Sequence, residues 1–197
     1  VNLEVQQWDV PTINLFGTID DGQGCWAAHM WNGTDIYHPN QQGHEAMASA
    51  FPLTMWEALQ AGKPLPQYVC TQGDTNGVEH VTFVPEGQAE SYTLSYVSAD
   101  TTYTEVYSAA QNKQWLYTNG QLLSTAEAVH KTVDTVTIHG SNIHQVLFYR
   151  AAMTEREVRV LAKGKMLRSS LEIYCPLLGG DTTNYAQTMN CVSIHNK

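Results

Sequence analysis

The sequence has few basic residues and no long apolar run. Lys and Arg account for 10 of the 197 residues against 19 Asp and Glu, so the net charge is −9, and residues 1–66 carry seven acids and only one base. Phosphate backbones bind basic surfaces, so we expect no nucleic-acid partner. No apolar stretch approaches the roughly 20 residues that a helix needs to cross a bilayer, so we also expect no membrane span.

Cysteine is scarce as well, and its spacing excludes one class of site. The four cysteines form no Cys-x-x-Cys pair and have no metal-ligand spacing with the eight histidines, so the sequence predicts neither a zinc site nor a cofactor. Cys175 and Cys191 are close enough in sequence to form a disulfide in an oxidising compartment, but buried thiols fit the sequence equally well. The state of all four, Cys25, Cys70, Cys175 and Cys191, stays open.

A carboxylate and an imidazole lie three residues apart in a loop that runs directly into a predicted helix. Asp35 can fold back to accept the Nδ1 proton of His38, which would fix the tautomer and leave Nε2 as a general base. Pro39 favours an extended conformation at His38, and Asn40 is a suitable N-cap for a helix running to about Gln60. The spacing therefore predicts one half of a hydrolytic triad.

The run Asp35-x-x-His38-Pro39-Asn40-x-x-Gly43-His44 resembles the last conserved block of the SGNH, or GDSL-type, ester hydrolases. The resemblance implies that Asp35 orients His38, that His38 is the catalytic base, and that residues 1–62 are the C-terminal segment of an incomplete α/β hydrolase domain. In that family the nucleophilic Ser lies near the start of the domain, so the implied partner is a missing N-terminal catalytic segment. We also expect an extracytoplasmic protein, secreted or periplasmic, whose signal peptide is absent from this chain.

The segments around this motif predict further elements. Residues Pro11 to Gly17 indicate a short strand that ends at glycine, and Pro52 predicts a kink or break in the helix. Residues 63–66 contain two prolines and are typical of a stiff linker between domains. In the loop before the motif, Trp31 is a candidate for lining an acyl or sugar pocket, or a packing anchor for the loop.

From Gln67 onward the sequence has Val, Thr, Tyr and Phe at alternate positions, which is typical of strands. Asn119-Gly120 between apolar flanks is the preferred two-residue hairpin turn, and Thr154 with Glu157 predicts a capping box on one helix. Short strands with turn signals and little helix predict a mainly β fold, an antiparallel jelly-roll sandwich over residues 67–197. The predicted strands are His80 to Val84, Ser91 to Ser98, Thr102 to Ser108, a hairpin from Gln114 to Leu123, Thr135 to His139 and Gln145 to Tyr149.

The stretch from Val146 to Gly164, a strand that ends in an aromatic residue and is followed by a short capped helix, resembles the closing segment of laminin-G-like, or concanavalin A-like, jelly rolls. Together with the hairpin around Asn119-Gly120, the resemblance covers most of residues 67–177. Since domains of this shape appended to secreted hydrolases often bind carbohydrate, the resemblance implies a carbohydrate ligand. No cluster of aspartates marks a calcium site.

Four aromatic residues on two neighbouring predicted strands are candidates for such binding. Tyr103 and Tyr107, with Trp115 and Tyr117 on the next strand, can supply exposed rings over a concave sheet. The same residues also fit alternating core positions of two packed sheets, which is the interpretation we favour for Trp115.

Two short runs resemble a Gly-Asp-Ser nucleophile block with Thr in place of Ser. They are Gly73-Asp74-Thr75 and Gly180-Asp181-Thr182, and both follow His38 in the chain, whereas the family's nucleophile precedes the catalytic His. Turn formation explains both runs better than catalysis does.

The sequence favours the C-terminal portion of a secreted SGNH-type ester hydrolase, acting on acylated carbohydrate or lipid, with an appended lectin-like sandwich. About sixty residues bury too little surface to fold as an independent hydrolase, so we expect this chain alone to be inactive. The alternative is a non-catalytic module for carbohydrate binding or for structural interactions, with the first sixty residues as an accessory layer on the sandwich.

Overall fold

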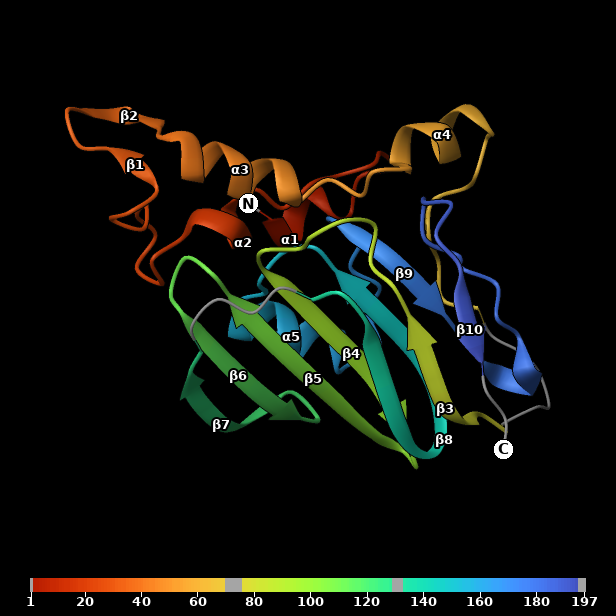
Figure 1. Cartoon of the computed structure of the whole chain (residues 1–197). Coiled ribbons are helices and arrows are strands. Elements are labelled where there is room, and N and C mark those ends of the chain that lie inside the picture. The colour runs from red at the N-terminus through yellow and green to blue at the C-terminus, as the bar shows by residue number, and fades with distance from the viewer. Residues whose placement is uncertain (1, 70–75, 129–132, 195–197) are drawn as a thin grey trace.

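Antiparallel β-sheet makes up most of the regular structure in the computed structural model of the chain (Figure 1), which describes residues 2–69, 76–128 and 133–194. The helices are α1 (Asn2–Val5), α2 (Phe16–Ile19), α3 (Gln41–Ser49), α4 (Met55–Gln60), α5 (Glu155–Leu161) and the 3-10 helix η1 (Leu178–Gly180). The strands are β1 (Trp31–Asn32), β2 (Asp35–Pro39), β3 (Val78–Phe83), β4 (Tyr92–Ser98), β5 (Thr101–Ser108), β6 (Lys113–Thr118), β7 (Gln121–Glu127), β8 (Val136–Tyr149), β9 (Leu171–Cys175) and β10 (Val192–Ile194).

The long strand β8 joins the two layers of a sandwich. Its first half, from Val136 to Ile143, pairs with β3, and its second half, from Ile143 to Tyr149, pairs with β4 and β9. The strand order is β10-β3-β8-β4-β5-β6-β7 with β9 also paired to β8, and these pairings are antiparallel. Phe83 of β3 packs against Phe148 of β8 with ring centroids 5.5 Å apart, so the two layers face each other. The prediction of a mainly β, antiparallel sandwich is confirmed.

Local sequence signals determine the hairpins and helix ends of this part of the chain. Asn119 and Gly120 both have positive φ, 50° and 75°, which is the backbone of the predicted two-residue turn between β6 and β7. At the start of α5, Thr154 and Glu157 form the predicted capping box, in which each side chain accepts a hydrogen bond from the backbone of the other. The segments predicted as two strands, Thr135 to His139 and Gln145 to Tyr149, are the two ends of the single irregular strand β8.

The larger of the two layers consists of β9, the second half of β8 and strands β4 to β7. Two apolar cores lie on its opposite faces. The first core is between the two β layers and includes Phe83, Tyr92, Tyr107 and Phe148. The second core is between the larger layer and α5, which lies behind β4 and β5 in Figure 1. Its central side chains are Val106, Tyr117, Leu147, Tyr149, Val158, Leu161 and Tyr174. The alternation of β5 residues between the two cores is the period-two pattern read from the sequence.

The first sixty residues lie against one end of the sandwich, above the sheet in Figure 1, and are held there by hydrogen bonds. Gln6 Oε1 accepts from two backbone N–H groups, of Arg168 at 2.5 Å and of Ser169 at 3.0 Å. The carbonyl of Gly17 accepts from Ala152 N at 2.9 Å. The domain division into residues 1–62, 63–66 and 67–197 stays a prediction. The structure adds that the first segment is hydrogen-bonded to the sandwich.

Arg150 is the most deeply buried cation at this junction, with 2% of its surface exposed. It pairs with Glu172 at 2.7 Å and donates to the carbonyl oxygens of Ser49, Glu86 and Gln88 at 2.5, 2.7 and 2.6 Å. Buried charges are tolerated when they are paired and fully hydrogen-bonded. One side chain therefore fastens the end of α3 to the sandwich.

Other local predictions have mixed outcomes. The strand predicted at Pro11 to Gly17 is wrong: residues 11–14 form no strand and α2 begins at Phe16. The helix predicted from Asn40 breaks as expected at Pro52, giving α3 and α4. Asn40 is its N-cap, accepting from Gly43 N at 2.9 Å.

No disulfide joins the cysteines among the described residues. Cys25 and Cys191 are exposed free thiols, and Cys175 is a buried one. Burial raises the pKa of the Cys175 thiol to about 12, which keeps it protonated. Cys70 and the run Gly73-Asp74-Thr75 lie outside the described residues.

The second Gly-Asp-Thr run forms a turn, as predicted. The carboxylate of Asp181 accepts from the backbone N–H of Thr183 and from the hydroxyl of Tyr185, both at 2.9 Å. These bonds are those of an Asx-type turn and not of a nucleophile block.

Candidate functional site

The predicted acid–base pair lies on a short two-stranded hairpin. Strands β1 and β2 are antiparallel, and the turn between them is closed by Asn32 Oδ1, which accepts from the backbone N–H and the hydroxyl of Thr34. On β2, Asp35 Oδ2 and His38 Nδ1 are 2.5 Å apart, while Asp35 Oδ1 accepts from Tyr37 N at 2.9 Å. The structure thus brings together the two residues that the sequence paired.

The electrostatics of this pair assign its proton. The backbone N–H of Tyr37 and the imidazole of His38 lower the pKa of the Asp35 carboxyl below 3.8. An ionised carboxylate only accepts, so Nδ1 of His38 carries the hydrogen of this bond, and in the neutral imidazole Nε2 has the free lone pair. The His38 side chain is 72% exposed and that of Asp35 39%. In the described part of the chain, no serine hydroxyl hydrogen-bonds to His38.

The predicted binding residue Tyr103 lies in a groove on the sandwich. Its ring stacks on that of Tyr96 across the β4–β5 hairpin, with centroids 5.4 Å apart, and 40% of Tyr103 is exposed. The open cavity at this place has a volume of about 290 Å³. We call it the aromatic groove and define it by Tyr96, Tyr103, Glu105, Leu116, Leu123 and His139.

Two other features of the groove bear on what it can bind. Burial, and then the neighbouring Tyr103 and Glu105, raise the pKa of Tyr96 above 10.0, so its hydroxyl stays protonated. Leu116 and Leu123 are 37% and 71% exposed, which gives the groove an apolar wall. No lysine or arginine is among the groove's described lining residues.

Tyr107, also predicted to bind ligand through an exposed ring, is buried. Its exposed fraction is 1%, and its ring packs beside Tyr92 in the first core with centroids 5.7 Å apart. The expectation of an exposed face is therefore wrong for Tyr107, because alternate residues of β5 point into the two cores. Tyr117 is buried in the second core, and Trp115 packs against that core as we favoured.

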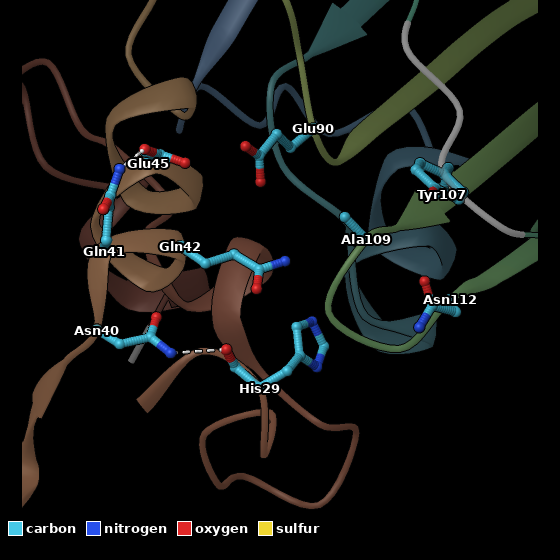
Figure 2. A pocket seen from close by; sticks show the side chains of 9 residues that line it. All are labelled: His29, Asn40, Gln41, Gln42, Glu45, Glu90, Tyr107, Ala109 and Asn112. Atoms are coloured by element: carbon cyan, nitrogen blue, oxygen red, sulfur yellow. Dashed lines mark hydrogen bonds between the residues drawn. The ribbon is translucent and has the colours of Figure 1, made fainter. Parts of the chain in front are cut away.

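Beside Tyr107, the loops of the sandwich and the N-terminal residues enclose a second cavity, of about 630 Å³. Figure 2 shows it from close by. We call it the junction pocket and define it by His29, Asn40, Gln42, Glu45, Glu90 and Asn112.

The third predicted binding residue, Trp31, lies in neither cavity. It is half-buried on β1, opposite Pro39 of β2, and its carbonyl accepts from Asn40 Nδ2 at 3.3 Å. The structure thus places Trp31, Tyr103 and Tyr107 in three different settings and does not bring them together. Among the groove residues, Tyr96, Glu105 and His139 were missed. The signal for Tyr96 was its place near the end of one predicted strand, close in sequence to Tyr103 at the start of the next.

The described residues contain no group of three or more His, Cys, Asp or Glu that could hold a metal ion. None of the helices in the described ranges is long and apolar enough to cross a membrane.

Comparisons with known proteins include two distant structural likenesses, described here. No protein-family model and no curated protein matches the chain. A putative carbohydrate binding protein from Bacteroides ovatus ATCC 8483 is 13% identical, with a TM-score of 0.44, over 60% of this chain and 57% of that one. A heptameric SAP-like pentraxin from Limulus polyphemus is 12% identical, with a TM-score of 0.36, over 65% and 90%. The architecture described above therefore rests on the strand pairings of this chain itself.

Proposed function

We propose that the chain is a carbohydrate-binding module of laminin-G-like type, working outside the cytoplasm, whose ligand lies in the aromatic groove. The observation that carries the proposal is the half-exposed Tyr103 ring stacked on Tyr96 at the edge of an open cavity. A flat aromatic face offers a sugar ring a large contact area at small entropic cost.

The polar groups of the groove fit a neutral sugar. Glu105 lies opposite Leu116 in the β5–β6 pairing and accepts from the Tyr92 hydroxyl, so this carboxylate is held in place at the groove. The protonated Tyr96 hydroxyl can donate to a ligand, and His139 adds a ring nitrogen on the opposite wall. Without a cation in the described lining, an anionic ligand has no counter-charge here.

Titration calorimetry against a panel of neutral oligosaccharides tests the proposal. We expect at least one glycan to bind, and Tyr103→Ala to weaken it by about five- to tenfold through loss of one stacking face. Tyr37→Ala is the matched control, since Tyr37 is 80% exposed on the β2 hairpin and lies outside the groove. The proposal would be overturned if no glycan in the panel bound, or if the Tyr103→Ala form bound its glycan as tightly as the unmodified protein.

The hairpin pair favours a second candidate function, one half of an SGNH-type ester hydrolase. The exposed His38 ring is bonded through Nδ1 to Asp35, which leaves Nε2 oriented as a general base. In this mechanism a serine Oγ from another segment attacks the ester carbonyl, His38 takes its proton, and Asp35 stabilises the imidazolium. Acylated carbohydrate or lipid would be the substrate.

Hydrolysis of p-nitrophenyl acetate separates this candidate from the first. We expect no activity from residues 1–197 alone, and activity from a form extended upstream by a Ser-bearing segment. His38→Ala should abolish that activity and Tyr37→Ala should preserve it, because Tyr37 contributes only its backbone N–H to the pair. Equal rates for the extended form and its His38→Ala variant would refute the assignment.

A further inference from the structure

Two leucine side chains line the aromatic groove and are open to solvent. Leu116 on β6 is 37% exposed and Leu123 on β7 is 71% exposed. The groove opens directly from the first core, since Leu94 and Ile138 belong both to that core and to the groove lining. Exposed apolar side chains that gather in a concave site mark a place where a ligand makes apolar contacts. The part of a sugar that contacts these leucines can therefore be inferred.

A bulge in β7 accompanies the placement of Leu123 in the groove. In the β6–β7 pairing, Tyr117 lies opposite Leu122 and Leu116 lies opposite Ser124, so Leu123 is the extra residue. The two neighbouring leucines of β7 serve different cavities: Leu123 lines the groove, whereas Leu122 lines a separate cavity beside α2. A ligand in the groove thus meets Leu123 and not Leu122.

The leucines lie on one side of the groove, toward the edge strand β7. The strands follow the order β4-β5-β6-β7 (Figure 1), and the groove residues with polar tips on β4 and β5 are Tyr96 and Glu105. Tyr103 lies opposite Thr118 of β6, so Leu116 is its diagonal neighbour, roughly 7–8 Å away. A sugar ring stacked on Tyr103 therefore has polar groups toward β4 and an apolar wall toward β7.

We propose that the aromatic groove selects a 6-deoxyhexose, a neutral sugar with a methyl group where a common hexose has a hydroxymethyl group. This inference rests on the proposed function and names its ligand class. With the ring stacked on Tyr103, the methyl group lies against Leu116 and Leu123. A hydroxyl group at the same place would lose its hydrogen bonds to water without gaining a partner. An N-acetyl group fits this wall less well, because its methyl group is attached to an amide that needs both a donor and an acceptor.

Two matched pairs of methyl glycosides test the preference: those of L-fucose and L-galactose, and those of L-rhamnose and L-mannose. The members of each pair differ only in the hydroxyl group at C6. Chemical-shift titration by NMR measures the dissociation constants, because it is suited to the weak binding of single sugars. We expect the deoxy member of at least one pair to bind about five- to tenfold more tightly, the effect of one hydroxyl group against a partly exposed apolar wall.

Substitutions of the two leucines of β7 locate the preference. Leu123→Asn keeps a side chain of similar size but makes it polar, so it should remove the preference and bind both members of the pair equally. Leu116→Asn is a second variant of the same wall and should reduce the preference. Leu122→Asn is the matched control, because Leu122 is also half-exposed, at 50%, but lines the other cavity, and it should keep the full preference.

Failure of this inference is distinguishable from failure of the proposed function. Equal affinities within both pairs, tighter binding of the hydroxylated members, or an unchanged preference in Leu123→Asn would overturn the 6-deoxyhexose assignment and leave the groove as a sugar site. Binding of other glycans but of none of these four would also overturn it. If no glycan bound at all, both the assignment and the proposed function would be overturned.

Discussion

The N-terminal residues 2–62 and the β-sandwich bury their apolar side chains in different ways. The sandwich has two extended cores rich in aromatic rings. The N-terminal part has helices of four to nine residues and one small cluster, formed by Ala27, Met30, Ala46 and the sandwich residue Ala110. Short helices with little core of their own depend on tertiary packing. The comparison teaches that the N-terminal part is stable only as a layer on the sandwich.

The largest expected effect tests that dependence at Arg150. Its replacement by Ala leaves Glu172 buried without its partner and frees three carbonyl groups, so we expect a loss of about 3–5 kcal/mol in the free energy of unfolding. Urea denaturation followed by circular dichroism measures it. Arg159→Ala removes an exposed pair with Glu155 on α5 and should cost less than about 0.5 kcal/mol. A similar loss of unfolding free energy in Arg150→Ala and Arg159→Ala would contradict the prediction.

A second prediction disturbs only the N-terminal part. Gly43→Ala places a methyl group against the carbonyl of Met30, so α3 must shift, and we expect a loss of about 1–3 kcal/mol in unfolding free energy. Gly33→Ala is the control, because a Cβ there meets nothing within 4 Å. Amide hydrogen exchange should show a loss of protection in residues 41–49 and unchanged protection in β4 and β5. Global loss of protection would instead mean that the two regions unfold as one unit.

A third prediction compares one helix cap from each region. Asn40→Ala and Thr154→Ala each remove an N-cap hydrogen bond, worth about 1 kcal/mol. The two losses of free energy are similar in size, but they destabilise different parts of the protein. α5 covers the second core, so Thr154→Ala should lower the midpoint of global unfolding, while Asn40→Ala should mainly increase exchange in α3. Identical exchange patterns for the two variants would remove the distinction.

The smallest expected effect is the pH dependence of the hairpin pair. The folded-state pKa of Asp35 is lowered, so the pair contributes stability above the unfolded-state value, and the contribution is lost as pH falls through the folded-state value. Asp35→Asn should therefore lower the melting temperature slightly at pH 7 and match the unmodified protein in stronger acid. NMR titration of the Asp35 carboxyl gives the check, and an unshifted midpoint would contradict it.

Sequence patterns predicted the features that depend on neighbouring residues. The Asn119-Gly120 turn, the capping box at Thr154 and the contact between Asp35 and His38 are each formed within a few residues. The alternation along β5 likewise follows from local chemistry, because Val106 belongs to the second core and the next residue, Tyr107, to the first.

Features that depend on distant residues were missed. Strand β9 is buried along its whole length and so shows no alternation, and its second residue, Glu172, is held by three distant groups: Arg150, the backbone N–H of Glu86 and the amide of Asn190. The apolar run at Pro11 to Gly17 has no strand to pair with, so it joins the end of the sandwich and turns into α2. The junction pocket could not be foreseen, since its walls meet only after the whole chain has folded.

The bonds of Gln6 and Arg150 also constrain when the protein can fold on the ribosome. Gln6 accepts from Arg168 and Ser169, which lie 162 and 163 positions later in the chain. The carbonyl of Ser49 accepts from Arg150, 101 positions later. Gln6 and Ser49 are thus synthesised long before their native partners. During translation Trp8 and Trp56 therefore lie in a segment that lacks its native partners until the final strands emerge.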